Sequence, residues 1–155
     1  MKDVSVIIGE VKFNYRVGLL IENGNQILVE CNPKYDFVVI PGGRIKTLES
    51  SIMALQREIK EEMGININPH ELKKKGLIEN FFEFEGKRFH ELLLVYKIKV
   101  KSKNNVFRNI INNLDSQDSY YKWIDKDKID DVNLLPIELK LLIKSKRFEI
   151  IVTNN

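Results

Sequence analysis

One stretch of the chain, residues 43–65, limits what it can fold into more than any other. It follows a glycine-rich run, Pro41-Gly42-Gly43, and continues into Glu49–Met63, which contains neither glycine nor proline and is rich in helix-forming residues. Regularly spaced apolar residues give this segment an apolar side, and Gly64 stands where a helix C-cap belongs. The sequence therefore predicts one long central helix that is entered through a glycine-rich loop.

Segments with strand character lie on both sides of this helix, and an Asn-Gly turn joins two of the early ones. The expected strands are Val4–Ile8, Arg16–Ile21, Gln26–Glu30, Phe37–Ile40, Leu77–Phe84, His90–Val100 and Tyr120–Ile124, and a second helix is expected at Pro136–Lys144. We found neither repeats nor a linker rich in proline and serine. The chain is therefore expected to form one α/β domain over residues 1–155 with a mixed sheet.

Composition excludes several classes of protein. The apolar stretches fall far below the roughly 18 to 20 residues of a membrane-spanning helix, and Met1–Gly9 lacks the features of an export signal. A single cysteine, Cys31, rules out an internal disulfide and is what a reducing compartment would permit. We expect a cytoplasmic protein that does not bind membranes.

The charge pattern argues against a nucleic acid polymer as partner. The net charge of +3 comes from 25 basic and 22 acidic residues that are mostly interspersed. The basic clusters are Lys73–Lys75 and the alternating lysines of residues 97–103, and both are expected to be solvated surface.

Three glutamates crowd together on the predicted central helix. Glu58 lies three residues before Glu61 and four before Glu62, so these carboxylates share or adjoin one face. Each like-charged pair costs about 0.2 to 0.5 kcal/mol. Arg57 can pair with Glu61, but Lys60 points away, so a net negative cluster remains. A solvated acidic face is one interpretation, and a site for a hard divalent cation such as Mg²⁺ is the other.

The spacing of the whole segment decides between these interpretations. It reads Gly43, five residues, Glu49, seven residues, and then the run of residues 57–65 from arginine to isoleucine. At every defined position this resembles the signature box of the Nudix hydrolase family. The resemblance implies an α/β/α sandwich with a mixed sheet, in which the box forms a loop, a helix and a loop that bind magnesium.

The resemblance also assigns roles to individual residues. Glu58, Glu61 and Glu62 would be ligands of Mg²⁺, or of Mn²⁺ in its place, with the carbonyl of Gly42 as a further ligand. Arg57 and Glu49 would be supports. They are eight residues apart, so a contact between them would have to brace the loop against the helix.

The proton acceptor lies outside the box in some members of this family. Asp118, just before the strand at residues 120–124, is the candidate here, and a turn-forming aspartate is the alternative. Glu79, Glu83 and Glu91 are competing carboxylates.

Contacts with the rest of the substrate are less defined by the sequence. Arg16 is a candidate phosphate contact, and Phe82 is the candidate among several aromatic residues for stacking on a base. His70, His90 and Cys31 are expected to be structural.

The expected function is hydrolysis of the diphosphate linkage of a nucleotide-like substrate. That substrate would be an oxidised or ordinary nucleoside triphosphate, or a nucleoside diphosphate sugar such as ADP-ribose. The alternative is a binding module that senses a nucleotide without cleaving it. The sequence leaves open the substrate, the phosphorus that is attacked, and whether the protein forms a homodimer.

Overall fold

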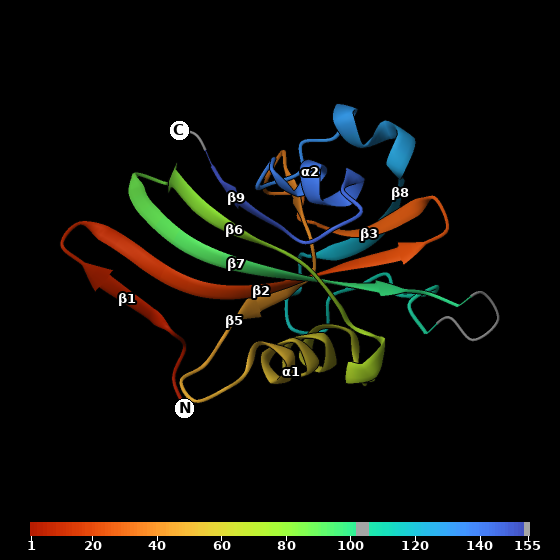
Figure 1. Ribbon diagram of the computed structural model, residues 1–155, viewed down its shortest axis with the longest axis horizontal. Helices are drawn as coiled ribbons and strands as arrows, with labels where there is room; N and C mark the ends of the chain where they lie inside the picture. The colour runs from red at the N-terminus through yellow and green to blue at the C-terminus, as the bar shows by residue number, and fades with distance from the viewer. Residues whose placement is uncertain (102–105, 154–155) are drawn as a thin grey trace.

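The computed structural model describes residues 1–101 and 106–153, and within them one nine-stranded sheet forms the centre of the molecule (Figure 1). The strands are β1 (Ser5–Ile8), β2 (Val11–Asn23), β3 (Gln26–Cys31), β4 (Val38–Val39), β5 (Gly42–Arg44), β6 (Lys73–Phe84), β7 (Lys87–Lys99), β8 (Tyr120–Asp125) and β9 (Glu149–Val152). Their main order is β4-β3-β2-β7-β6-β9, while β1 and β5 pair with β2 and β8 pairs with β3.

The sheet combines both strand directions. β2 runs parallel to β7 and β6 runs parallel to β9, whereas the other pairs are antiparallel. This confirms the mixed sheet that the sequence predicts.

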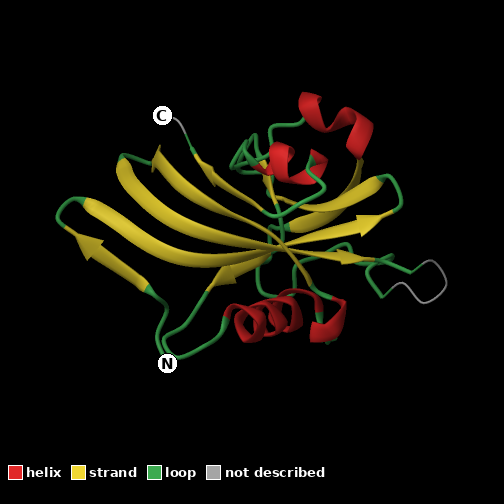
Figure 2. Ribbon diagram, viewed as in Figure 1, coloured by secondary structure: helices red, strands yellow, loops and turns green. Residues whose placement is uncertain are grey.

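Helices cover both faces of the sheet (Figure 2). Helix α1 (Ser51–Met63) lies against one face, and α2 (Leu139–Lys144) lies over the other, together with the 3-10 helix η2 (Lys126–Asp131). A second 3-10 helix, η1 (Pro69–Glu71), follows α1. The predicted α/β/α arrangement is therefore present. Among the residues that the structure describes, none of the helices combines the length and the apolar composition of a membrane span.

The two faces of the sheet have separate apolar cores. On β2, Leu19 and Ile21 pack in the cluster that contains Ile59 of α1. The intervening Leu20 packs in the opposite cluster, with Leu139 of α2. Because successive side chains point to opposite faces, a strand covered on both sides is apolar without interruption.

The ends of α1 follow from its capping residues. Ser50 has extended backbone angles, and its side chain accepts a hydrogen bond from the backbone N–H of Met53 at 3.2 Å. Gly64 ends the helix in the left-handed conformation, with φ at 71°. The helix thus begins at Ser51 rather than at Glu49 as expected, and Glu49 belongs to the loop before it.

Several expectations about the strands need correction. β2 begins at Val11 instead of Arg16, and β6 begins at Lys73 instead of Leu77. The sequence did not indicate β9, a four-residue strand whose partner β6 lies some 70 residues earlier in the chain. Short strands of this kind are defined by their partner more than by their own pattern.

The expectation of a solvated lysine cluster is wrong for Lys75. This residue is 5% exposed, and its amine donates a hydrogen bond to the carbonyl of Ser145, the C-cap residue of α2. Burial lowers the pKa of Lys75. A cation at the C-terminal end of a helix is favourable, so Lys75 helps to hold α2 on the sheet.

Candidate active site

The glycine-rich loop runs alongside β2, because β3 pairs with only one end of that strand and β5 pairs with its middle. β2 pairs with β3 only at Glu22 and Asn23, and with β5 at residues 16–18. At this crossing Gly42 has φ at 152°, and a Cβ on it would overlap the carbonyl of Val17. Only glycine allows β5 to approach β2 this closely.

Gly43 makes room for a carboxylate. A Cβ on this residue would overlap the carboxylate of Glu58, which therefore lies directly against the loop backbone. The two neighbouring glycines thus have different roles. Gly42 allows the backbone of β2 to lie close to the loop, and Gly43 leaves space for the carboxylate of Glu58.

Arg57 connects the helix to the loop. Its Nε donates to Glu49 Oε1 at 2.8 Å and its Nη2 donates to Glu49 Oε2 at 3.0 Å. Nη2 also donates to the carbonyl of Arg44, and Nη1 donates to Glu58 at 2.7 Å and to Glu61 at 3.4 Å. These contacts raise the pKa of Arg57, chiefly through Glu49. The contact expected between Arg57 and Glu49 is therefore present, and it braces the loop against the helix.

The three box glutamates differ in environment. The side chain of Glu61 is 43% exposed, whereas that of Glu58 is 14% exposed and Glu62 is buried. Glu62 Oε2 accepts a hydrogen bond from Tyr121 at 3.1 Å, and the backbone N–H of Gly42 also bonds to this carboxylate. Burial, together with the charges of Glu30 and Glu58, raises the pKa of Glu62 to about 8.

Glu30 is a fourth carboxylate at this site, and the sequence did not reveal it. It lies on β3, and its charge is the second largest cause of the raised pKa of Glu62, after burial. Asn113 Nδ2 donates to Glu30 at 3.1 Å, and Ser119 also hydrogen-bonds to it. Burial raises the pKa of Glu30 as well. The only signal in the sequence was a charged residue inside an apolar strand.

The segment before β8, from residue 106 onward, packs against the end of α1 that carries Glu62. Phe107 is buried in the core on the α1 face, and the N–H of Leu114 donates to the carbonyl of Glu62 at 2.8 Å. Of the polar stretch from Ser102 to Gln117, the part from residue 106 onward therefore packs at the C-terminal end of α1, while residues 102–105 lie outside the described part of the chain.

The donors fit a hard divalent cation by their chemistry. Carboxylate oxygens of Glu58, Glu61 and Glu62 are what Mg²⁺ prefers, and burial together with the charges of Glu30 and Glu58 raises the pKa of Glu62. Within residues 1–101 and 106–153, no three His, Cys, Asp or Glu side chains stand in a geometry ready to hold a metal. Glu58 Oε1 accepts from Arg57 and Glu62 Oε2 accepts from Tyr121, so each of these carboxylates has one oxygen engaged within the protein.

The remaining candidate residues are spread around this cluster. Asp118 is exposed in the bend before β8, next to Ser119, and its role stays a prediction. Glu83 is exposed and Glu79 is half-buried, both on β6. Phe82 stacks on Phe89 with ring centres 4.8 Å apart.

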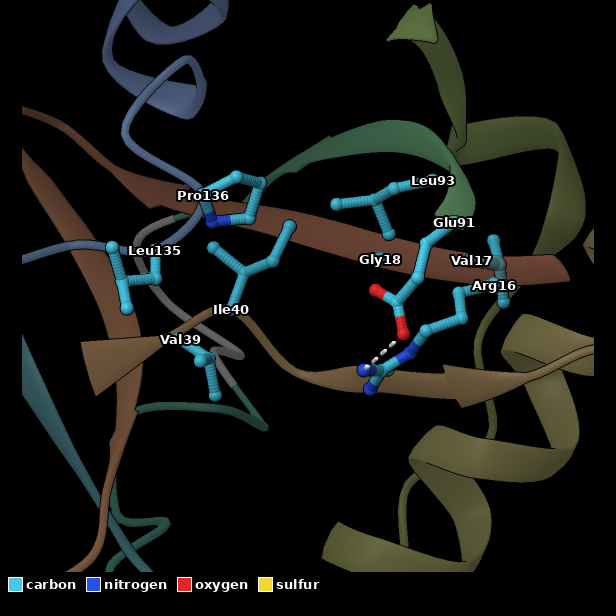
Figure 3. A pocket seen from close by; sticks show the side chains of 10 residues that line it. Arg16, Val17, Gly18, Val39, Ile40, Glu91, Leu93, Leu135 and Pro136 are labelled. Atoms are coloured by element: carbon cyan, nitrogen blue, oxygen red, sulfur yellow. Dashed lines mark ion pairs between the residues drawn. The ribbon is translucent and has the colours of Figure 1, made fainter. Parts of the chain in front are cut away.

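Arg16 lies at the wall of a small pocket on the sheet face opposite α1 (Figure 3). Its guanidinium pairs with Glu91 at 3.7 Å, and its charge also favours the ionised forms of Glu58 and Glu30. Arg16 therefore stands between the carboxylate cluster and the pocket.

Two of the three residues expected to be structural, Cys31 and His90, have apolar neighbours, whereas His70 is exposed in η1. Cys31 is buried in the core on the α2 face, and burial raises the pKa of its thiol. His90 packs against Phe81 and Phe13.

Comparison with known proteins identifies related sequences and folds. A family model described as NUDIX domain matches residues 12–143. Over 68 residues the chain is 37% identical to 8-oxo-dGDP phosphatase NUDT18 of Danio rerio, a match that covers 44% of this chain and 19% of that protein. The chain thus spans about a fifth of the length of this relative.

Solved structures show the same fold. A MutT protein from Bacillus halodurans aligns with a TM-score of 0.66 at 21% identity, covering 87% of this chain and 85% of that one. A MutT protein from Methanosarcina mazei Go1 gives 0.63 at 19% identity, covering 89% and 94%. The Ap4A hydrolase of C. elegans gives 0.56 at 19% identity, covering 85% and 94%.

Proposed function

Because the chain belongs to the Nudix hydrolase family, we propose that it cleaves the diphosphate linkage of a nucleotide-like substrate in a reaction that requires Mg²⁺. The observation that carries this proposal is that Glu58 on α1 interacts electrostatically with Glu61 and Glu62, and that Glu62 also interacts with Glu30 on β3. Such a concentration of carboxylates is stabilised by a divalent cation that also binds phosphate oxygens.

Each residue of the cluster has a role in this proposal. Glu58, Glu61 and Glu62 would hold the metal, and the carbonyl of Gly42 would be a further ligand. Arg57 and Glu49 keep the loop at a fixed distance from the helix. When bound, Mg²⁺ would neutralise charge on the diphosphate and lower the pKa of the attacking water.

Three residues outside the box complete the proposed site. Arg16 would bind a phosphate oxygen, since its guanidinium faces both the cluster and the pocket. Asp118 would accept a proton from the attacking water. Phe82 would offer a ring for the base, provided that the substrate extends along β6 and β7.

The substrate is proposed as a class. It would be a nucleoside triphosphate, oxidised or ordinary, or a nucleoside diphosphate derivative such as ADP-ribose. The names of the relatives include 8-oxo-dGDP and Ap4A, and these compounds belong in the first panel of candidates.

The test is hydrolysis of this panel with Mg²⁺ or Mn²⁺, with both products identified. At least one compound should be cleaved, and Glu61→Gln and Glu62→Gln should each lower the rate by roughly a hundredfold or more. Glu71→Gln, which changes an exposed carboxylate in η1, is the matched control and should leave the rate unchanged. A panel that stays intact with either metal contradicts the proposal.

The same panel separates the alternative, a nucleotide-sensing module. Thermal stabilisation by a nucleotide without any turnover would support that alternative.

Activity of Asp118→Asn over a range of pH tests the proton acceptor, and unchanged turnover would exclude Asp118. A cytoplasmic location and a homodimer are further proposals, and light scattering on the purified protein tests the second.

A further inference from the structure

A buried carboxylate lies beside Arg16 on the sheet face opposite α1. Glu91 of β7 is 5% exposed, and its Oε1 is 3.7 Å from Arg16 Nη1 of β2. Figure 3 shows the two side chains pointing toward one another at the wall of the pocket. Apart from Arg16 and Glu91, the pocket is lined mainly by apolar residues, among them Ile40, Leu93 and Pro136.

We propose that Glu91, held by Asn14, is a positioning residue that keeps the guanidinium of Arg16 at the border between this pocket and the carboxylate cluster, where it binds a phosphate group of the substrate. This inference rests on the proposed function. It assigns to Glu91 the role of orienting Arg16. It also implies that the part of the substrate beyond the phosphates lies on the α2 side of the sheet.

The position of Arg16 supports this role. It lies on β2 opposite Arg44 of β5 and opposite Leu93 of β7, so it stands where the glycine-rich loop crosses the sheet. Its strand partner Arg44 accepts a hydrogen bond from Arg57 of the carboxylate cluster through its carbonyl, while Arg16 Nη1 faces Glu91 on the other side. A phosphate held by the guanidinium would therefore adjoin both the cluster and the pocket.

Glu91 is itself fixed by a chain of hydrogen bonds. Ser5 Oγ donates to Asn14 Oδ1 at 2.7 Å, and Asn14 Nδ2 donates to Glu91 Oε1 at 2.8 Å. Asn14 is 2% exposed, so this chain connects β1, β2 and β7 in a closed environment. A buried carboxylate that is held in this way has one orientation available to it.

The same geometry leaves donors of Arg16 available. Glu91 Oε1 is already engaged by Asn14, and its distance of 3.7 Å from Nη1 exceeds that of a hydrogen bond. Within the described part of the chain, the buried Nε of Arg16 has no hydrogen-bond acceptor. A guanidinium presents its donors in a planar fork that matches phosphate oxygens. Glu91 therefore orients Arg16 by charge without occupying the atoms that a phosphate would use.

The experiment measures binding of methylenediphosphonate, a diphosphate analogue whose P–C–P bridge cannot be hydrolysed, by calorimetry in the presence of Mg²⁺. Arg16→Gln should weaken binding about tenfold or more, because a charged donor is lost. Glu91→Gln keeps the shape and the hydrogen bond from Asn14 but removes the charge that orients Arg16, and it should weaken binding roughly fivefold. Glu91→Asp, which retains the charge, should recover part of the loss.

The matched control is the pair of Arg88 and Glu10, which joins β7 to the turn before β2 at 2.8 Å with both side chains exposed. Glu10→Gln should leave binding unchanged. Asn14→Ser is a second variant that frees Glu91 without removing its charge, and it should also weaken binding. Thermal melting of each variant shows whether it is folded.

The outcomes are separate from those of the proposed function. If Glu91→Gln and Asn14→Ser bind the diphosphonate as wild type does, or more tightly, the inference is wrong even if Arg16→Gln binds weakly. If wild type binds the diphosphonate and these variants do not, yet no compound of the panel is cleaved, the inference stands and the catalytic proposal falls. With an active substrate, Glu91→Gln should raise KM by a larger factor than it lowers kcat.

Discussion

Arg57 and Glu49 lie eight residues apart in the sequence and form a two-pronged ion pair, with donor–acceptor distances of 2.8 and 3.0 Å. The side chain of Glu49 is only 4% exposed, and its Oε2 also accepts from the backbone N–H of Lys46. The pair thus ties the loop before α1 to the middle of the helix, directly beside Glu58.

Arg57→Lys should weaken this connection, because an ammonium group cannot donate in a planar fork to both oxygens. We expect the free energy of unfolding to fall by about 1 to 3 kcal/mol, and turnover to fall as Glu58 loses its neighbour. Urea unfolding and rate measurements check both. The control is Arg88→Lys, which alters an exposed ion pair and should leave both values near those of wild type. Equal effects of the two substitutions would contradict the special role of Arg57.

The pH dependence of stability should reflect Glu62. Its pKa is about 8 in the folded protein, against an ordinary value of 4.5, so the folded state binds a proton that the unfolded state releases. The stabilisation from the protonated group is complete below pH 4.5 and is lost as the pH rises through 8. In metal-free buffer the slope attributable to Glu62 would approach about 1.4 kcal/mol per pH unit at most.

Urea unfolding between pH 5 and 8.5 in the presence of a chelator measures this slope. The pKa values of Glu30 and Glu58 are also raised, so these residues contribute to the slope in the same direction. The informative quantity is therefore the difference in slope between wild type and Glu62→Gln. The variant should lose part of the decline in stability with pH. Parallel curves for the two proteins would show that Glu62 ionises normally.

Gly43→Ala should displace the carboxylate of Glu58, because the added methyl group would occupy the same space. We expect weaker Mg²⁺ binding together with lower activity, while the fold survives. Calorimetric titration with Mg²⁺ measures the first effect. Gly9→Asn is a suitable control, since Gly9 has φ at 60°, has open space around it and lies in the turn before β2. An alanine variant that binds Mg²⁺ as tightly as wild type would refute the steric argument.

Tyr121→Phe should affect Glu62 through one hydrogen bond. The phenol of Tyr121 donates to Glu62 and lowers its pKa, so its removal should raise that pKa further and cost about 1 kcal/mol of stability. The decline in stability should then continue to higher pH than in wild type. Tyr120→Phe removes the neighbouring hydroxyl, which faces Cys31 instead, and should leave the pH profile in place. If Tyr120→Phe shifted the pH profile of stability more than Tyr121→Phe did, Tyr121 would not be the residue that orients Glu62.

Local pattern was enough to predict α1 and the box. The absence of glycine and proline from residues 49–63, and the spacing of Arg57 and the three glutamates, are short-range properties that a helix converts directly into shared faces. The same reasoning anticipated that Arg57 would contact Glu61 and that Glu49 would meet Arg57, and both contacts are present. Its error at the first turn was small, since Ser50 caps the helix one residue after Glu49.

Contacts between distant segments were decided only by the tertiary structure. Glu30 approaches Glu62 because β3 and α1 pack on one core, and Glu91 approaches Arg16 because β7 runs parallel to β2. Neither pairing has a spacing that can be recognised along the chain, since strand register is set by the packing of whole faces. Local periodicity was therefore sufficient to establish the helix and its carboxylates. The residues that shift the pKa values of these carboxylates are brought near them only by the fold, because burial and long-range register exist only after the sheet has formed.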